Sequence, residues 1–146
     1  MATVRRAEAV WEGDLLSGKG RVSAKSSGMF KDQPVSWAAR TETPDGKTSP
    51  EELLAAAHAS CFAMALSAGL ARGKTPATKL EISAQVTFDK VGAGFKVTAS
   101  ALEVRGSVKG LDQGGFQKAA EAAKDGCPIS QAIKGNVELS VKATLA

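Results

Sequence analysis

The chain contains nineteen consecutive residues, Leu53 to Ala71, without a single Asp, Glu, Lys or Arg. Eight of these residues are alanines, which favour helix, and among the rest are a cysteine and the only histidine of the chain. An uncharged helix of this length needs cover on nearly every side, and a chain of 146 residues has little interior to supply it. The segment therefore predicts a buried central helix that a second copy of the chain helps to enclose.

Signals at both ends predict that this helix covers residues 49–72. Ser49 is suited to the N-cap, Pro50 to the first turn, and Glu52 to a capping box with Ser49. Arg72 supplies a cationic last turn, and the glycine after it is a C-cap candidate.

A membrane-spanning interpretation is open to any apolar segment of about twenty residues. Alanine drives insertion only weakly, and His58, Ser60, Cys61 and Ser67 make the segment more polar. We therefore expect a protein core helix and no membrane association.

Period-two alternation marks the strands after the helix. Apolar residues at even positions from Leu80 to Phe88 alternate with polar ones, and a glycine-rich turn follows. Phe95, Val97, Ala99 and Ala101 continue the alternation, and a last strand carries its apolar residues at odd positions.

The order of elements predicts one α+β domain over residues 1–146, with antiparallel sheets around the long helix and no βαβ series. Its expected parts are strands within 3–41, the helix 49–72, strands within 78–105, helices at 111–124 and 128–134, and a last strand at 136–145.

The charge and aromatic content argue against nucleic-acid binding. A net charge of +4 is spread along the chain without a basic run, and two tryptophans, five phenylalanines and no tyrosine make a base-stacking surface improbable. The N-terminal residues lack a hydrophobic signal core, which favours a cytoplasmic protein.

Two cysteines exclude a disulfide-rich scaffold, and in a reducing cytosol they favour a transient bridge over a structural one. One histidine and two cysteines are too few for a closed zinc site. We expect no metal and no bound cofactor.

Cys127 precedes a proline, which predicts that it caps a short helix near 129–133. Free N–H groups there would stabilise a thiolate, although the residue could equally fill a turn. Cys61 lies too deep in its helix for such help, and burial raises the pKa of a thiol. A reactive Cys61 needs a cation, for which His58 and Arg40, placed at the end of a strand from Val35, are candidates. On composition alone, His58 would be a packed residue with one hydrogen bond, and Arg40 an exposed charge.

Three segments closely resemble the OsmC/Ohr family of organic hydroperoxide reductases, in its OsmC branch. They are Trp37-Ala38-Ala39-Arg40, Thr48 to Phe62 with His58-Ala59-Ser60-Cys61 at its centre, and Gly126-Cys127-Pro128. The spacing of 66 residues between the cysteines fits the family, and the element order resembles it over essentially the whole chain.

The resemblance implies a thiol peroxidase that acts on alkyl hydroperoxides and, more weakly, on hydrogen peroxide. Cys61 would be the peroxidatic thiolate, Cys127 the resolving thiol, and Arg40 with Glu51 the pair that activates Cys61. The resemblance also implies an intertwined homodimer with sites at the subunit interface, and dihydrolipoyl groups of partner proteins as the dithiol reductant.

Glu51 and Cys61 are ten residues apart, so on one straight helix about 15 Å separates them. A single arginine can hardly bridge that distance. We therefore predict that Glu51 serves the site of the other subunit, with a simple helix-start charge as the alternative.

Two other functions remain open. The chain could be a non-enzymatic dimeric module that holds a small hydrophobic ligand near Cys61, or a structural dimer whose cysteines are incidental. Hydroperoxide consumption that depends on Cys61 separates the enzyme from both.

Overall fold

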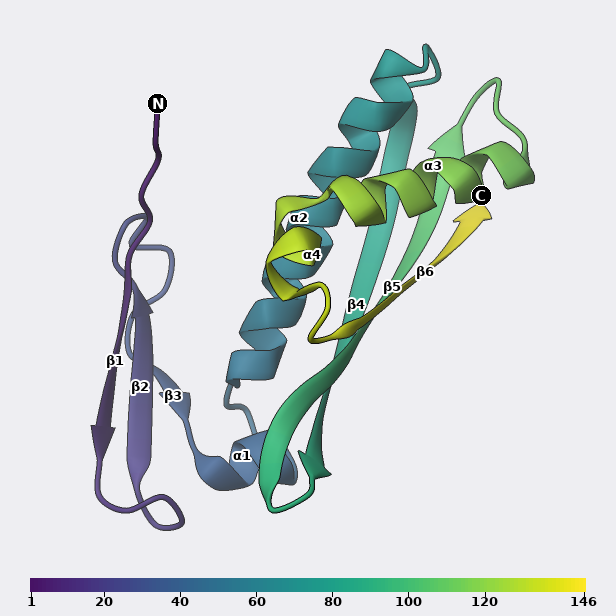
Figure 1. The fold of residues 1–146 in the computed structure, drawn as a ribbon. Coiled ribbons are helices and arrows are strands. Elements are labelled where there is room, and N and C mark those ends of the chain that lie inside the picture. The colour runs from purple at the N-terminus through teal and green to yellow at the C-terminus, as the bar shows by residue number, and fades with distance from the viewer. The chain divides into compact units, whose positions relative to one another are not determined.

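The computed structural model describes residues 1–146, which form two compact units, Met1–Leu53 and Leu54–Ala146. The first unit contains three strands, a short helix and the first turn of a long helix; the second contains the rest of that helix, three strands and two further helices (Figure 1). The elements are β1 (Ala7–Glu12), β2 (Lys19–Ala24), β3 (Gln33–Val35), α1 (Trp37–Thr41), α2 (Pro50–Arg72), β4 (Ala77–Val91), β5 (Gly94–Val108), α3 (Gln113–Gly126), α4 (Pro128–Ile133) and β6 (Glu138–Leu145).

In the first unit the strands form an antiparallel sheet in the order β1-β2-β3. The strand expected to run from Val35 to Arg40 is wrong, because β3 ends at Val35 and Arg40 lies on α1. Ser36 explains the change of structure, since its hydroxyl accepts the Ala39 N–H at 3.1 Å and caps the helix.

The sheet of the second unit has the order β4-β5-β6. β4 and β5 are antiparallel, but β6 runs parallel to β5, so the expectation of wholly antiparallel sheets without a βαβ connection is wrong at this strand. The reason is the crossover through α3 and α4, which carries the chain back along the sheet to the level of Ala99, from where β6 runs in the same direction as β5 (Figure 1). The α+β class itself is confirmed.

A β-bulge reverses the alternation that the sequence predicts along β5. The β4–β5 pairing shifts by one residue between Val97 and Ala99, so Thr98 is the extra residue. Because one residue exchanges the two faces of a strand, Ala101 does not continue the inner face of Val97. The buried residues after the bulge are instead Ser100, Leu102, Val104 and Gly106.

The core of the second unit lies between this sheet and the helices α2 and α3. The helices contribute Phe62, Leu66, Leu70, Phe116, Ala120 and Ala123, and the sheet contributes Leu102, Val104, Val141 and Ala143. Gly106 lets the Phe116 ring approach β5 closely, because a Cβ atom there would collide with that ring and lie 3.1 Å from Leu80 Cδ2.

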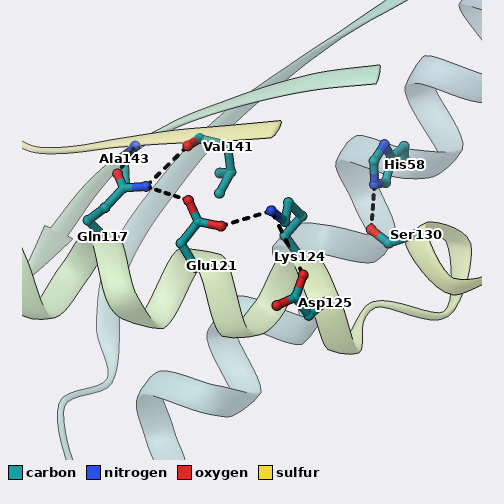
Figure 2. A network of polar contacts seen from close by, with 8 residues as sticks. All are labelled: His58, Gln117, Glu121, Lys124, Asp125, Ser130, Val141 and Ala143. Atoms are coloured by element: carbon teal, nitrogen blue, oxygen red, sulfur yellow. Dashed lines mark hydrogen bonds and ion pairs between the residues drawn. The ribbon is translucent and has the colours of Figure 1, made fainter. Parts of the chain in front are cut away.

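Two glutamines of α3 cover the outer edge of β6, and Figure 2 shows one of them, Gln117. Gln117 donates to the Val141 carbonyl at 3.1 Å and accepts the Ala143 N–H at 2.8 Å. Gln113 likewise donates to the Ala143 carbonyl at 2.7 Å and accepts the Leu145 N–H at 2.9 Å. The side-chain amides therefore replace a neighbouring strand at this edge.

Ser49 caps α2 as predicted, since its hydroxyl accepts the Glu52 N–H at 3.1 Å. The Glu52 carboxylate accepts from the Thr48 hydroxyl at 2.8 Å, which replaces the return bond of a capping box. By length and composition α2 could cross a membrane, but one of its faces packs into the core just described. Only 22% of its most apolar stretch is buried within the chain, so the expected cover on nearly every side is not provided by one chain.

Candidate active site

The two cysteines meet in the second unit. Cys61 lies on α2 and Cys127 lies between α3 and α4, and both are free thiols. Their side chains are neighbours that shift each other's pKa, and both belong to the packed core, where Cys127 is fully buried. The fold therefore joins two thiols that are far apart in sequence, which is the arrangement a transient disulfide requires.

Cys127 is the N-cap of α4, with Pro128 at the first helical position, as the sequence predicts. Burial is the largest single influence on its pKa and acts upward. The pKa of Cys127 is nevertheless lowered, because polar groups around the sulfur together outweigh burial. These groups are the Cys61 thiol, the backbone N–H groups of Ser130 and Ile129, and the Ser130 hydroxyl.

The pKa of Cys61 is raised, first by burial and then by the neighbouring Cys127 side chain, while the Ile129 N–H acts in the opposite direction. The two pKa values are thus shifted in opposite directions, so that Cys127 is the more acidic thiol of the pair in this unit. The expectation that Cys61 needs an external cation to ionise agrees with this result.

His58 lies one turn before Cys61 on α2 and is completely buried. Its Nδ1 is 2.6 Å from the Ser100 hydroxyl. Its Nε2 is 2.7 Å from the Ser130 hydroxyl, the contact drawn in Figure 2. It therefore makes two hydrogen bonds where one was expected. Burial lowers the pKa of His58, so the ring is neutral.

Ser100 and Ser130 are not among the site residues predicted from the sequence. Ser130 could have been found, because a residue three positions after an N-cap faces back toward it. Ser100 gave no such signal, since only the bulge at Thr98 turns it toward the helices.

Arg40 and Glu51 form a two-point ion pair in the first unit. Arg40 Nε is 3.1 Å from each carboxylate oxygen of Glu51, and Nη2 is 2.7 Å from Oε1. Glu51 is 8% exposed, and the Arg40 guanidinium also lies 5.9 Å from the centre of the Trp37 ring. Carboxylate and ring together fix the guanidinium in one orientation.

A pocket of about 340 Å³ lies beside Arg40 in the same unit. Its walls are mostly apolar, so it suits a hydrophobic group next to a cation. The lining residues are Trp11, Leu15, Val35, Ser36, Trp37, Arg40 and Pro50.

The four predicted site residues thus form two pairs, Cys61 with Cys127 and Arg40 with Glu51. The first pair belongs to the unit Leu54–Ala146 and the second to the unit Met1–Leu53. A contact between Arg40 and Cys61 stays a prediction.

Comparison with known proteins gives a consistent family assignment. A family model described as OsmC-like protein matches residues 43–142. Peroxiredoxin OsmC of Escherichia coli is 42% identical over 139 residues, which cover 95% of this chain and 96% of that protein. The organic hydroperoxide resistance protein of Xanthomonas axonopodis pv. citri is 32% identical over 95 residues, covering 64% of this chain and 65% of that one.

The fold has the same relatives. The crystal structure of the organic hydroperoxide resistance protein OhrB of Bacillus subtilis superposes with a TM-score of 0.75 at 28% identity, covering 95% of this chain and 98% of that one. An OsmC-like protein from Mycoplasma pneumoniae has a TM-score of 0.74 at 14% identity and covers 100% and 99% of the two chains, and it supports the fold alone.

Proposed function

The chain belongs to the OsmC-like protein family, and from that premise we propose that it is a cysteine-based peroxidase that reduces organic hydroperoxides to alcohols and hydrogen peroxide more weakly. Relatives named as a peroxiredoxin and as organic hydroperoxide resistance proteins support a peroxidase of this general type. The observation that carries the proposal is that the fold brings Cys61 and Cys127 together as neighbours in one core.

Three balanced steps make up the proposed cycle. The Cys61 thiolate attacks the O–O bond, takes one oxygen as a sulfenic acid, and releases the alkoxide, which leaves as the alcohol after it gains a proton. Cys127 then attacks the sulfenic sulfur, so that a disulfide forms and hydroxide leaves as water. A dithiol reductant, by family resemblance a dihydrolipoyl group, reduces the disulfide and becomes oxidised itself.

The first step needs Cys61 to be ionised. In the single chain, however, groups of Ile129 and Ser130 lower the pKa of Cys127 and so favour the thiolate on Cys127. We propose that the Arg40 guanidinium reverses this preference, since a cation beside a thiol lowers the pKa of that thiol. Glu51 would keep Arg40 oriented, as their two-point pair suggests.

We further propose that the site forms in a homodimer. On the helix α2, ten residues separate Glu51 from Cys61, a rise of about 15 Å. Because Arg40 is paired with Glu51, its guanidinium would serve Cys61 of the partner subunit. The large apolar area of α2 that one chain does not bury is consistent with a partner helix against it.

The organic part of the substrate would occupy the pocket beside Arg40. Trp11, Leu15 and Trp37 offer apolar and aromatic surface there, which suits an alkyl or aryl tail. We also propose a cytoplasmic location, because the cycle needs a supply of the dithiol reductant.

The same pocket also supports a second candidate, a module that holds a small hydrophobic ligand without any chemistry. Replacement of Cys61 separates the two. Ligand binding alone would survive the loss of this thiol, and peroxide consumption would not.

The direct test is stopped-flow consumption of cumene hydroperoxide and of hydrogen peroxide, with dihydrolipoamide as the reductant. Cys61→Ser should abolish both reactions. Cys127→Ser should retain one turnover and accumulate a sulfenic acid that mass spectrometry detects. Ser60→Ala is the matched control, because Ser60 is the exposed neighbour of Cys61 and bonds only within its own helix, to the carbonyl groups of Ala56 and Ala57. Full steady-state turnover by either cysteine variant would overturn the two-cysteine scheme.

A further inference from the structure

A buried chain of polar side chains ends at Cys127, and the proposed cycle does not yet use it. His58 and Ser100 are 0% exposed and Ser130 is 1% exposed, so all three lie inside an otherwise apolar core. Burial of polar groups in such a place is unfavourable unless each is hydrogen-bonded. Both ring nitrogens of His58 are satisfied, by Ser100 on one side and by Ser130 on the other.

Ser130 links the imidazole to the resolving thiol. It lies in the first turn of α4, the helix that Cys127 caps, and its hydroxyl is one of the groups that lower the pKa of Cys127. Hydrogen bonds therefore run from Ser100 on β5, through His58 on α2, to Ser130 on α4, which lies beside the two thiols.

The hydrogen atoms allow only two arrangements of this chain. In the first, the neutral ring carries its proton on Nε2, which donates to Ser130, so that the Ser130 hydroxyl hydrogen is left to face Cys127. In the second, the ring proton is on Nδ1, which donates to the Ser100 hydroxyl. The Ser130 hydroxyl then donates its hydrogen to Nε2. Only the first arrangement gives the Cys127 thiolate a hydroxyl donor.

We propose that His58 is a positioning residue for the resolving thiol: its Nε2 proton turns the Ser130 hydroxyl toward Cys127 and holds that sulfur ready to attack the Cys61 sulfenic acid. Ser100 supports the arrangement by donating to Nδ1. This inference rests on the proposed peroxidase cycle, in which it assigns a role to three residues outside the two site pairs.

The arrangement changes with the state of Cys127. The thiolate accepts the hydrogen of Ser130, and this bond disappears when the sulfur gives its electron pair to the new disulfide. Ser130 can then donate to Nε2, so the ring proton moves to Nδ1 and toward Ser100. His58 would thus have one tautomer while Cys127 is a thiolate and the other in the disulfide form.

Nitrogen-15 NMR tests this directly, because His58 is the only histidine of the chain. In Cys61→Ser, at a pH where Cys127 is the thiolate, the ring should be protonated at Nε2 and bare at Nδ1, and the wild-type disulfide form should show the opposite pattern. A Cys127 thiolate beside a ring with its proton on Nδ1 would overturn the proposal.

Thiolate titration supplies a second test. In a Cys61→Ser background Cys127 is the sole thiol, and ultraviolet absorbance measures its ionisation although it is buried. Ser130→Ala should raise the Cys127 pKa by about one pH unit, since one hydrogen bond to a charged group is lost. Ser130→Thr, which keeps the hydroxyl, should restore it, and His58→Phe should raise it as well. An unchanged pKa in Ser130→Ala would contradict the proposal.

Single-turnover kinetics separate this inference from the function on which it rests. With one equivalent of cumene hydroperoxide, Ser130→Ala should consume peroxide no more slowly than the wild type but form the disulfide about tenfold more slowly, with sulfenic acid accumulating. Val104→Ala is the control for destabilisation of the same core by an apolar residue that cannot hydrogen-bond to His58 or Ser130, and it should leave the second step unchanged. If Ser130→Ala forms the disulfide at the wild-type rate, the proposed role of His58 and Ser130 is wrong, whereas the proposed peroxidase activity is unaffected. If the wild type consumes no peroxide, the proposed peroxidase activity itself is wrong.

Discussion

Glu51 holds Arg40 through both of its carboxylate oxygens, with the Arg40 Nε at 3.1 Å from each and Nη2 at 2.7 Å from one. An arginine fixed in this manner loses little further freedom when it binds an anion, which makes it a suitable activator for a thiolate. The pair lies in the unit Met1–Leu53, and Cys61 lies in the other unit. The mechanism therefore depends on whether Arg40 serves Cys61 of its own chain or of the partner subunit.

Subunit complementation should show whether the pair acts across a dimer. Arg40→Met lacks the cation and Cys61→Ser lacks the nucleophile, so each homodimer should be nearly inactive. An equal mixture, unfolded and refolded together, should recover about a quarter of the wild-type rate, because half of the dimers are mixed and each has one complete site. Peroxide consumption by the mixture is the measurement. A mixture no more active than its components would place Arg40 and Cys61 of one chain in the same site.

Gly106→Ala should destabilise the protein by about 1–3 kcal/mol, because the added methyl group would force the Phe116 ring and Leu80 apart. Urea unfolding measures the loss. Gly94→Ala is the matched control in the same strand, since nothing lies within 4 Å of a Cβ placed there. Equal changes in the free energy of unfolding of the two variants would show that the close contact between β5 and α3 does not contribute to stability.

Gln117→Leu should loosen β6 at its outer edge. The change removes the acceptor of the Ala143 N–H and the donor to the Val141 carbonyl, and an unpaired buried group costs about 1–3 kcal/mol. Hydrogen exchange at the Ala143 amide should accelerate. Gln85→Leu, an exposed glutamine on β4, should leave that amide unchanged. Protection at Ala143 that survives Gln117→Leu would mean that pairing with β5 alone secures the strand.

His58 should make the folded protein sensitive to acid. Burial lowers the pKa of His58 below its ordinary value of 6.5, so the unfolded chain binds the proton more tightly than the folded one. The stability that neutral His58 provides is therefore present above pH 6.5 and falls as the pH drops below it, by up to about 1.4 kcal/mol per pH unit. Unfolding free energies of wild type and His58→Phe at several pH values measure this, and their difference should shrink toward low pH. A constant difference would mean that the folded protein protonates His58 as easily as the unfolded one does.

Local rules accounted for much of the fold and of the site. The cap at Ser49, the N-cap position of Cys127 and the alternation along β4 follow from short-range chemistry, and each is found in the structure. Recognition of the sequence motifs around Arg40 and Cys61 supplied the site residues.

What the sequence could not predict depends on contacts between distant segments. The bulge at Thr98 depends on pairing with β4, and it alone brings Ser100 to face His58. The parallel pairing of β6 depends on the path of α3 and α4 over the sheet. Arg40 lies on a helix because the Ser36 cap outweighs a pattern that also suited a strand.

The unequal exposure of the two sulfurs sets a direction for the chemistry. Cys61 is partly exposed whereas Cys127 is buried, so an incoming reductant would attack the Cys61 sulfur of a disulfide, and Cys127 would be the leaving group. The sulfur expelled is the one whose pKa is lowered, and a more acidic thiol is the better leaving group. Regeneration would thus be fast from one side only, and a small thiol attached to Cys61 as a mixed disulfide would leave as a free thiol when Cys127 attacks the Cys61 sulfur.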